Sequence, residues 1–156
     1  MMEKRVDVGS LLVLAFTVVY VIVMWKALPD TIPIHFNLQG ESDGWGSPGT
    51  LFILPLITAG LWLGMTVLEK YPHTFNYLHL TRENMRFQYE NILMQVNVMK
   101  NFIVVSFCCL TWVIVQSAAD GGLNRGFLPV MIGGIGGTFG IIGFFLVRSL
   151  RKGEKT

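Results

Sequence analysis

Charged residues are scarce in this sequence. Asp, Glu, Lys and Arg make up 14% of its 156 residues, whereas soluble domains carry about 25%. The deficit comes from four long runs without any charge, and 52% of the chain is hydrophobic. This composition excludes an ordinary soluble domain and predicts an integral membrane protein. The net charge of +2 is too small to indicate a nucleic-acid partner.

The sequence has only two cysteines and three histidines, and we identify no set of residues with the pattern of a catalytic site. The two cysteines, Cys108 and Cys109, are adjacent within an uncharged run. Neighbouring helical residues rarely meet the geometry of a disulfide, so we interpret both as small apolar side chains. The three histidines are dispersed, and their spacing does not match a closed zinc site. We therefore expect no enzyme activity and no cofactor.

The four uncharged runs are each long enough, with their flanks, to cross a bilayer. A helix needs about 20 residues to span a hydrocarbon core of about 30 Å. The predicted fold class is an all-α integral membrane protein with four transmembrane helices in a single membrane domain, residues 1–156. The expected spans are about 8–28, 50–69, 100–119 and 127–148, separated by an external loop at 29–49 and a cytoplasmic segment at 70–99.

The positions of the basic residues predict the orientation of the helices. Ten of the twelve Lys and Arg residues lie before the first run, between the second and third runs, or after the fourth. The other side has only Lys26 and Arg125. Because loops rich in Lys and Arg stay in the cytoplasm, we expect both termini inside a bacterial plasma membrane. The first run lacks the cleavage pattern of a signal peptide, so we interpret it as a retained helix.

The uncharged runs also lack ionisable residues and are rich in glycine. Asp, Glu, Lys, Arg and His are absent from all four, which argues against a pump or a proton-coupled transporter. Glycines four apart let helices approach closely. Such spacings predict either packing of the second helix on the fourth or homo-oligomerisation through the fourth. The residues concerned are Gly60 and Gly64 in the second run, and Gly133, Gly137 and Gly140 in the fourth.

The loop after the first run has the pattern of an ordered structure. Apolar and polar residues alternate between Ile32 and Leu38, which is the periodicity of a strand with one apolar face. The density of Gly, Ser, Asp and Pro at 40–49 predicts tight turns. His35 and Asn37 either hydrogen-bond the turn backbone or bind an extracytoplasmic ligand, and His35 with Asp43 is the candidate for a metal site. The candidate ligand-binding residues are Pro33, His35, Asn37, Gly40, Asp43 and Trp45.

A helix is predicted from Thr81 into the third run. Apolar residues recur at spacings of three and four from Met85 to Ile103, whereas charged side chains lie off this stripe. The stripe either packs on the other helices or lies at the membrane interface. In a second interpretation, this segment docks a cytoplasmic regulator through Arg82, Arg86 and Tyr89.

The external loop resembles a known family. Residues 28–47, LPDTIPIHFNLQGESDGWGS, are similar to the LP-x-x-IP-x-HFN-x-x-G-x-x-D loop of domain of unknown function family 1648. That domain forms the N-terminal part of SdpI-type bacteriocin-immunity proteins of Gram-positive bacteria. The resemblance implies protection against a secreted toxic peptide, with a transcriptional repressor held at the membrane as its cytoplasmic partner. This chain departs from those proteins because it has four spans and lacks an obvious match to their C-terminal part.

The expected function is binding of an extracytoplasmic ligand by a multi-pass membrane protein, with SdpI-like immunity or sensing of a secreted peptide as its specific form. The alternatives are a small transporter component and a membrane enzyme with an external His/Asp metal site.

Overall fold

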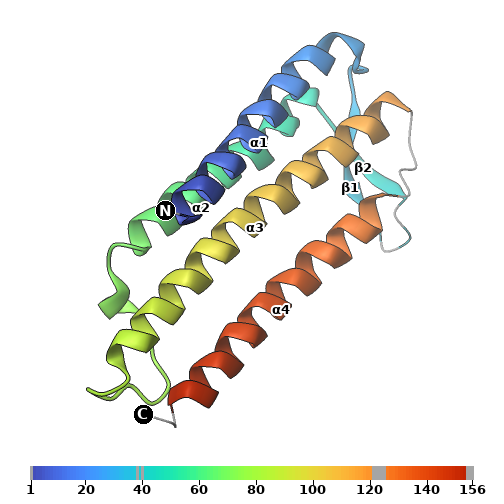
Figure 1. Ribbon diagram of the computed structural model, residues 1–156. Coiled ribbons are helices and arrows are strands. Elements are labelled where there is room, and N and C mark those ends of the chain that lie inside the picture. Colours follow the sequence, from blue (N-terminus) through green and yellow to red (C-terminus); the bar gives the residue numbers. More distant parts are fainter. Residues whose placement is uncertain (1, 38, 40, 121–125, 154–156) are drawn as a thin grey trace.

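The computed structural model describes residues 2–37, 39, 41–120 and 126–153. They form a bundle of long helices with a small β-hairpin at one end, called the hairpin end below (Figure 1). All four helices are long and apolar enough to cross a membrane, as predicted. The elements are α1 (Met2–Met24), β1 (Ile32–Phe36), β2 (Ser42–Gly46), α2 (Ile53–Leu68), α3 (Met85–Ala119) and α4 (Phe127–Gly153). Short 3₁₀ turns occur at Trp25–Ala27, Pro48–Phe52 and Pro72–Thr74.

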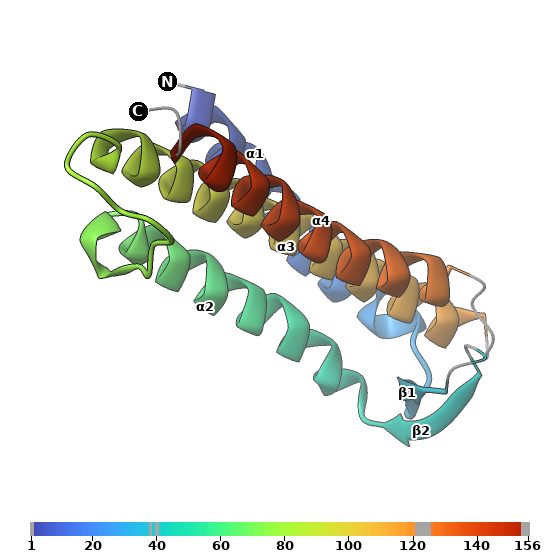
Figure 2. The same ribbon diagram turned by 90° about the horizontal axis from the view of Figure 1, so that it is seen from below.

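Helix α3 is the centre of the bundle. It packs against α1, α2 and α4, whereas no comparable helix pair joins α2 and α4 among the described residues. Figure 2 shows α2 and α4 as separate helices that flank α3. The predicted packing of the second helix on the fourth is therefore wrong. A Cβ atom at Gly60 or Gly64 would have no neighbour within 4 Å, so these glycines make no close helix contact.

One glycine of α4, Gly137, allows a close contact with α3. A Cβ atom at Gly137 would lie 2.2 Å from Cζ of Phe102, so the phenyl ring occupies the space that glycine leaves open. Gly133 and Gly140 face open space instead, because a Cβ atom added at either would have no neighbour within 4 Å. Of the three glycines proposed to form an oligomer contact, one is thus already covered within the chain.

The helices are staggered along the bundle axis. Helix α3 has 35 residues and is about 52 Å long at 1.5 Å per residue, which exceeds a hydrocarbon core of about 30 Å. Its C-terminal part packs with α1, where Val21 and Val115 share a buried cluster. Its N-terminal part packs with the end of α4, where Asn91 Nδ2 donates to the carbonyl of Phe145. In Figure 1, α4 is accordingly displaced away from the hairpin end relative to α1.

A reciprocal pair of hydrogen bonds precedes α3. The Thr81 N–H donates to Asn84 Oδ1 at 2.9 Å, and the Asn84 N–H donates to Thr81 Oγ1 at 3.2 Å. This arrangement resembles a capping box, which satisfies backbone donors at a helix start. The predicted helix start at Thr81 is correct to within about one turn, because the helix itself begins at Met85.

The face that α3 buries differs from the predicted apolar stripe. Val96 and Met99 are buried as expected, but Met85 is exposed. Gln88 and Asn91 are buried in its place, since they hydrogen-bond α4. The expected amphipathic helix and the third uncharged run form one continuous helix, as the apolar spacing predicts.

Candidate functional site

The predicted strand is one arm of the antiparallel hairpin. Register shifts on both sides of His35 interrupt the alternation of side chains. Ile32 and Pro33 are consequently both buried, whereas Ile34 is exposed, so the predicted single apolar face is wrong. The paired residues are Ile32 with Gly46, Pro33 with Trp45, His35 with Gly44, and Phe36 with Ser42.

Two glycines of β2 allow the hairpin to close. A Cβ atom at Gly44 would lie 2.8 Å from Cβ of His35, and one at Gly46 would lie 2.8 Å from Cδ1 of Ile34. At Gly44 the close atom is a Cβ, so an added side chain would move the opposite strand, whereas at Gly46 it would displace the end of the Ile34 side chain. The hairpin is anchored in the bundle because Ile32 is fully buried beside Val21 and Val115.

His35 and Asp43 meet across the hairpin. Nδ1 of His35 hydrogen-bonds Oδ1 of Asp43, and the two side chains are 72% and 45% exposed. An exposed pair of this kind contributes little to stability. Among the described residues, no group of three or more His, Cys, Asp or Glu side chains converges as a metal site would require. Asp43 is therefore a partner of His35 at the protein surface.

Asn37 shapes the turn that follows β1. Its Oδ1 accepts hydrogen bonds from the N–H groups of Gln39 and Glu41, at 3.0 and 2.9 Å. Its own N–H donates to the Glu41 carbonyl at 2.9 Å. This is an Asx-type turn, the backbone role considered for Asn37 above. Gly40, also among the candidate residues, lies outside the described residues, and Trp45 is exposed on β2.

Residues 40–44 read Gly-Glu-Ser-Asp-Gly, which has the G-x-S-x-G spacing of a hydrolase nucleophile elbow. That elbow is a sharp turn from a strand into a helix. Here Ser42 opens strand β2 instead, and its Oγ has no hydrogen-bond partner. His35 bonds Asp43 rather than Ser42. Among the described residues, Ser42 therefore does not have the surroundings of a serine hydrolase nucleophile.

A cavity of about 530 Å³ opens beneath the hairpin. It lies between β1, the start of α2, α3 and the start of α4, and is called the hairpin cavity below. The rings of Phe36 and Phe127 stack on its wall with centroids 4.2 Å apart. A concave, largely apolar surface with a few polar groups is typical of a ligand site. The polar lining residues are His35, Asn37, Thr50 and Thr111, and the apolar ones include Leu54, Leu110, Ile114, Leu128 and Met131.

A second, narrower cavity continues from the hairpin cavity along the bundle. Its volume is about 260 Å³, and it lies between α3 and α4. Leu110 and Met131 line both cavities, and nearly all other lining atoms of the second are apolar. An apolar track thus runs from the hairpin towards Phe102 and Thr138.

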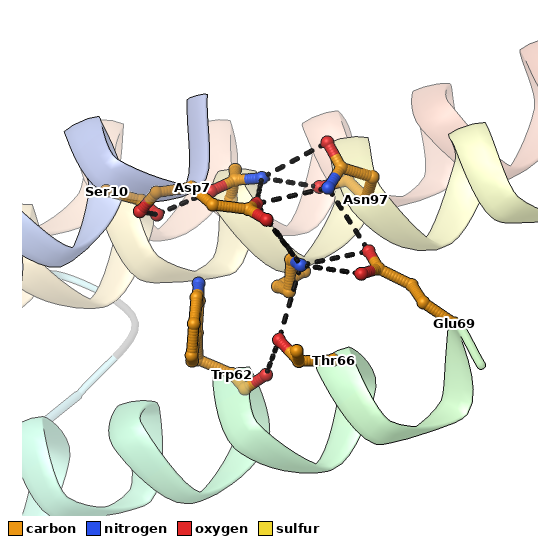
Figure 3. A network of polar contacts seen from close by, with 8 residues as sticks. Asp7, Ser10, Trp62, Thr66, Glu69 and Asn97 are labelled. Carbon is orange, nitrogen blue, oxygen red and sulfur yellow. Dashed lines mark hydrogen bonds and ion pairs between the residues drawn. The ribbon is translucent and has the colours of Figure 1, made fainter. Parts of the chain in front are cut away.

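A buried ion-pair network lies further along the bundle (Figure 3). The side chain of Lys100 is 0% exposed, and its Nζ lies 3.1 Å from Asp7 and 2.9 Å from Glu69. The ammonium group also donates to Thr66 Oγ1 at 3.3 Å. Lys100 thereby joins α3 to α1 and to the end of α2. The Lys100 network comprises Asp7, Ser10, Thr66, Glu69, Asn97, Lys100 and Asn101.

Two amides of α3 complete the network. Asn97 Nδ2 donates to Asp7 at 3.1 Å and to Glu69 at 3.2 Å, and Asn101 Nδ2 donates to Asp7 at 2.9 Å. The Trp62 ring lies 5.2 Å from the Lys100 ammonium, at cation–π distance. These donors stabilise two carboxylates beside one ammonium, as a buried ion pair requires.

The four uncharged runs contain no ionisable residue, but helices that carry them do. Asp7 belongs to the apolar segment Val6–Ala27, and Lys100 lies within α3. The sequence carries a signal for this network, because Asn97, Lys100 and Asn101 have the spacing that places them on one helical face. The uncharged runs alone do not reveal it.

The candidate docking residues lie around the start of α3. Arg82 is exposed, and Arg86 Nε lies 3.0 Å from Glu90 Oε1, with side chains 93% and 62% exposed. Tyr89 is half-buried and packs against Tyr77, with ring centroids 5.4 Å apart. Burial, and secondarily the neighbouring Tyr89, raises the pKa of Tyr77 to about 12. Arg86 is thus a surface residue, whereas Tyr89 helps to hold the preceding segment.

The fold and its apolar helices define a multi-pass membrane protein. Residues 12–59 match the family described as "Domain of unknown function (DUF1648)", which confirms the family resemblance of the loop. This segment covers the second half of α1, the hairpin and the start of α2. An uncharacterized protein of Archaeoglobus fulgidus is 27% identical over 138 residues, covering 79% of this chain and 75% of the relative. No solved structure matches the chain.

Proposed function

We propose that this protein binds a secreted hydrophobic peptide in the hairpin cavity, as part of SdpI-like immunity or sensing. The observation that carries the proposal is the cavity of about 530 Å³ between the hairpin and three helices. The family match covers the hairpin that forms one wall of this cavity.

The orientation predicted from the basic residues supports an extracytoplasmic ligand. Ten of twelve Lys and Arg residues lie on the side that retains both termini, so the positive-inside rule places the hairpin outside the cell. A ligand could then enter the hairpin cavity from the outer face of the membrane.

The lining of the cavity favours a peptide with apolar side chains. Leu54, Ile114 and Met131 offer contacts to such side chains, while His35 and Thr50 offer polar groups to a peptide backbone. The exposed imidazole of His35 is held by Asp43, which limits its rotation. In sites of this kind, the apolar walls supply most of the contact with the ligand, and a few polar groups set the orientation of the ligand.

A cavity-filling substitution tests the proposal. Cells that produce the protein are challenged with a panel of secreted hydrophobic peptide toxins, and the inhibitory concentrations are measured. Wild type should raise that concentration for at least one peptide. Leu128→Trp should abolish the protection by filling the cavity, whereas Ile132→Trp, on an exposed position of the same helix, should preserve it. Immunoblots of membranes would confirm equal amounts of each variant.

Protection by Leu128→Trp equal to that of wild type would contradict binding in the hairpin cavity. Sensitivity to every peptide in the panel, with or without the protein, would count against an immunity role.

A small transporter component is the second candidate, favoured by the Lys100 network. Ionisable groups at membrane depth commonly mark transport or proton pathways, and Lys100 is fully buried between two carboxylates. Proton or solute flux into sealed vesicles containing the purified protein, lost in Lys100→Met, would support this function. Vesicles with and without protein that show equal flux would exclude it under those conditions.

A further inference from the structure

The apolar track between α3 and α4 is continuous with the hairpin cavity, because Leu110 and Met131 line both. From these residues it follows the two helices to Phe102 and Thr138. That is eight positions along α3 and seven along α4, or about 10–12 Å at 1.5 Å per residue. One leaflet supplies half of a hydrocarbon core of about 30 Å, so the track fits within a single leaflet.

Small residues keep the track open, and a phenyl ring bounds its far end. A Cβ atom added at Gly134 would lie 3.7 Å from the Cβ of Ser106 on the opposite helix, and both residues line the track. Further along, the ring of Phe102 fills the space beside Gly137, where an added Cβ would lie 2.2 Å from Cζ. The track is therefore a slot of limited length that begins at the hairpin cavity.

The track borders the lipid-facing surface of α4. Ile135 and Phe139 line the track and are also 53% and 70% exposed. At the hairpin end, Ile34 and Ile53 line the hairpin cavity and are exposed in the same way. A molecule anchored in the bilayer can thus reach both cavities from the side, and its hydrocarbon chain never has to enter water.

The charges around the two cavities do not suit a phosphate group. Among the residues that the structure describes, neither lining includes Lys or Arg, the side chains that usually bind phosphate. The imidazole of His35 is already paired with the carboxylate of Asp43. The polar lining residues offer imidazole, amide and hydroxyl groups, which hydrogen-bond uncharged amides well. A peptide backbone therefore matches the hairpin cavity better than a phospholipid headgroup does.

We propose that the ligand is an acylated peptide, with its peptide part in the hairpin cavity and one linear acyl chain in the apolar track. This inference rests on the proposed function, because it names the class of peptide that the same cavity binds. The sizes agree with this division. The hairpin cavity has a volume of about 530 Å³ and a partly polar lining, whereas the track has about 260 Å³ and an almost entirely apolar one.

Photo-crosslinking of the purified full chain in phosphatidylcholine nanodiscs tests this site. The probe is an uncharged peptide of glycine and alanine with a lauroyl chain on its N-terminus and a diazirine at the end of that chain. Mass spectrometry locates the adducts, which should lie at Phe102, Thr138 and Phe139 at the far end of the track. A phosphatidylcholine with the same photoreactive chain should label exposed residues of the helices without preference for the track.

Competition in wild type shows whether the acyl chain is what binds. An excess of the unlabelled lauroyl peptide should remove the adducts in the track. The same peptide with an acetyl group in place of the lauroyl chain should leave them, because it cannot reach beyond the hairpin cavity. This comparison needs no substitution in the protein.

Filling the track from either wall should remove the same adducts. Gly134→Leu places a branched side chain opposite Ser106, and Ser106→Leu fills the same space from α3. Gly133→Leu is the matched control and should label as wild type, because a Cβ atom there has no neighbour within 4 Å. Melting temperatures in detergent show whether each variant folds, and if one filling variant does not, the other decides.

Three results would overturn the proposal. The first is equal labelling of the track by the peptide probe and by phosphatidylcholine, since any chain of the bilayer would then fill it. The second is equal competition by the acetyl and lauroyl peptides. The third is persistence of the adducts in a folded filling variant.

Protection assays distinguish failure of this inference from failure of the proposed function. Gly134 lines the track, whereas Leu128 lines the hairpin cavity. If Leu128→Trp loses protection while Gly134→Leu keeps it, for acylated and plain peptides alike, the hairpin cavity remains a peptide site and the acyl chain is overturned. Specific adducts in the track without protection against any peptide would support the acyl site and count against immunity.

Discussion

Lys100 holds an ammonium group that has no access to water. Its side chain is fully buried, and Asp7 and Glu69 lie within ion-pair distance. The two carboxylates depend on this single cation together with the amides of Asn97 and Asn101. The consequence is that one residue of α3 fixes the start of α1 and the end of α2.

Replacement of Lys100 by methionine should therefore destabilise the protein. Two partly buried carboxylates would lose their shared cation, and breaking such a pair costs about 3–5 kcal/mol. Thermal unfolding in detergent measures the effect. Arg86→Met is the matched control, because the Arg86–Glu90 pair is exposed and contributes about 1 kcal/mol or less.

The triple variant Lys100→Met, Asp7→Asn, Glu69→Gln should recover much of the lost stability, because it leaves no unpaired charge. Equal melting temperatures for Lys100→Met and Arg86→Met would show that the Lys100 network contributes nothing special to the fold.

Residue-level prediction from the sequence succeeds where partners are close along the chain. His35 and Asp43, eight positions apart, do meet. Lys100 lies 93 positions from Asp7 and 31 from Glu69, so only the packed bundle brings them together. A lysine at the border of an uncharged run can extend its ammonium group to the membrane surface or form an ion pair inside the bundle. The sequence looks the same in both cases.

The helices and the first strand were the most predictable elements, whereas residues 42–46, within the segment predicted to form tight turns, form β2. Uncharged runs of about 20 residues define the spans, and alternation identified β1. The join between the cytoplasmic helix and the third span could also be foreseen, because the apolar spacing continues without Gly or Pro. The partner of each helix could not be foreseen, since glycine spacing marks a smooth face without showing which helix covers it.

Gly137 contacts α3 and Gly140 does not, and this difference predicts how substitutions in α4 affect stability. Gly137→Ala should destabilise the α3–α4 contact by about 1–3 kcal/mol, the usual cost of overpacking, because the new methyl group meets the Phe102 ring. Gly140→Ala should be neutral or stabilising, because nothing lies within 4 Å of its added methyl group and alanine favours helices. Melting temperatures in detergent compare the two.

A second substitution identifies the cause. Phe102→Leu combined with Gly137→Ala should restore stability relative to Gly137→Ala alone, because the smaller side chain makes room. If Gly137→Ala and Gly140→Ala have the same effect, the Phe102 contact does not determine how α4 packs.

At the scale of the whole molecule, the bundle has two chemically distinct ends. The hairpin end carries the hairpin cavity and the family loop, while the other end carries most of the basic residues. The Lys100 network lies between them and ties three helices together (Figure 3).

The predicted orientation gives a direct expectation for chemical labelling. In a background with Cys108 and Cys109 replaced by alanine, Trp45→Cys should react with a membrane-impermeant maleimide in intact cells. His73→Cys, an exposed position between α2 and α3, should react only after the membrane is permeabilised. The reverse pattern would invert the topology and remove the extracytoplasmic setting of the hairpin cavity.

Photo-crosslinking from inside the hairpin cavity tests whether a secreted peptide binds there. A photoreactive amino acid replaces Leu128 in the cavity wall or, as the control, Ile132, whose side chain is 67% exposed on the same helix. Cells exposed to a peptide against which the protein protects are irradiated, and mass spectrometry identifies the adducts. We expect a peptide adduct at position 128 and only lipid adducts at position 132. Lipid adducts alone at both positions would contradict peptide binding in the hairpin cavity.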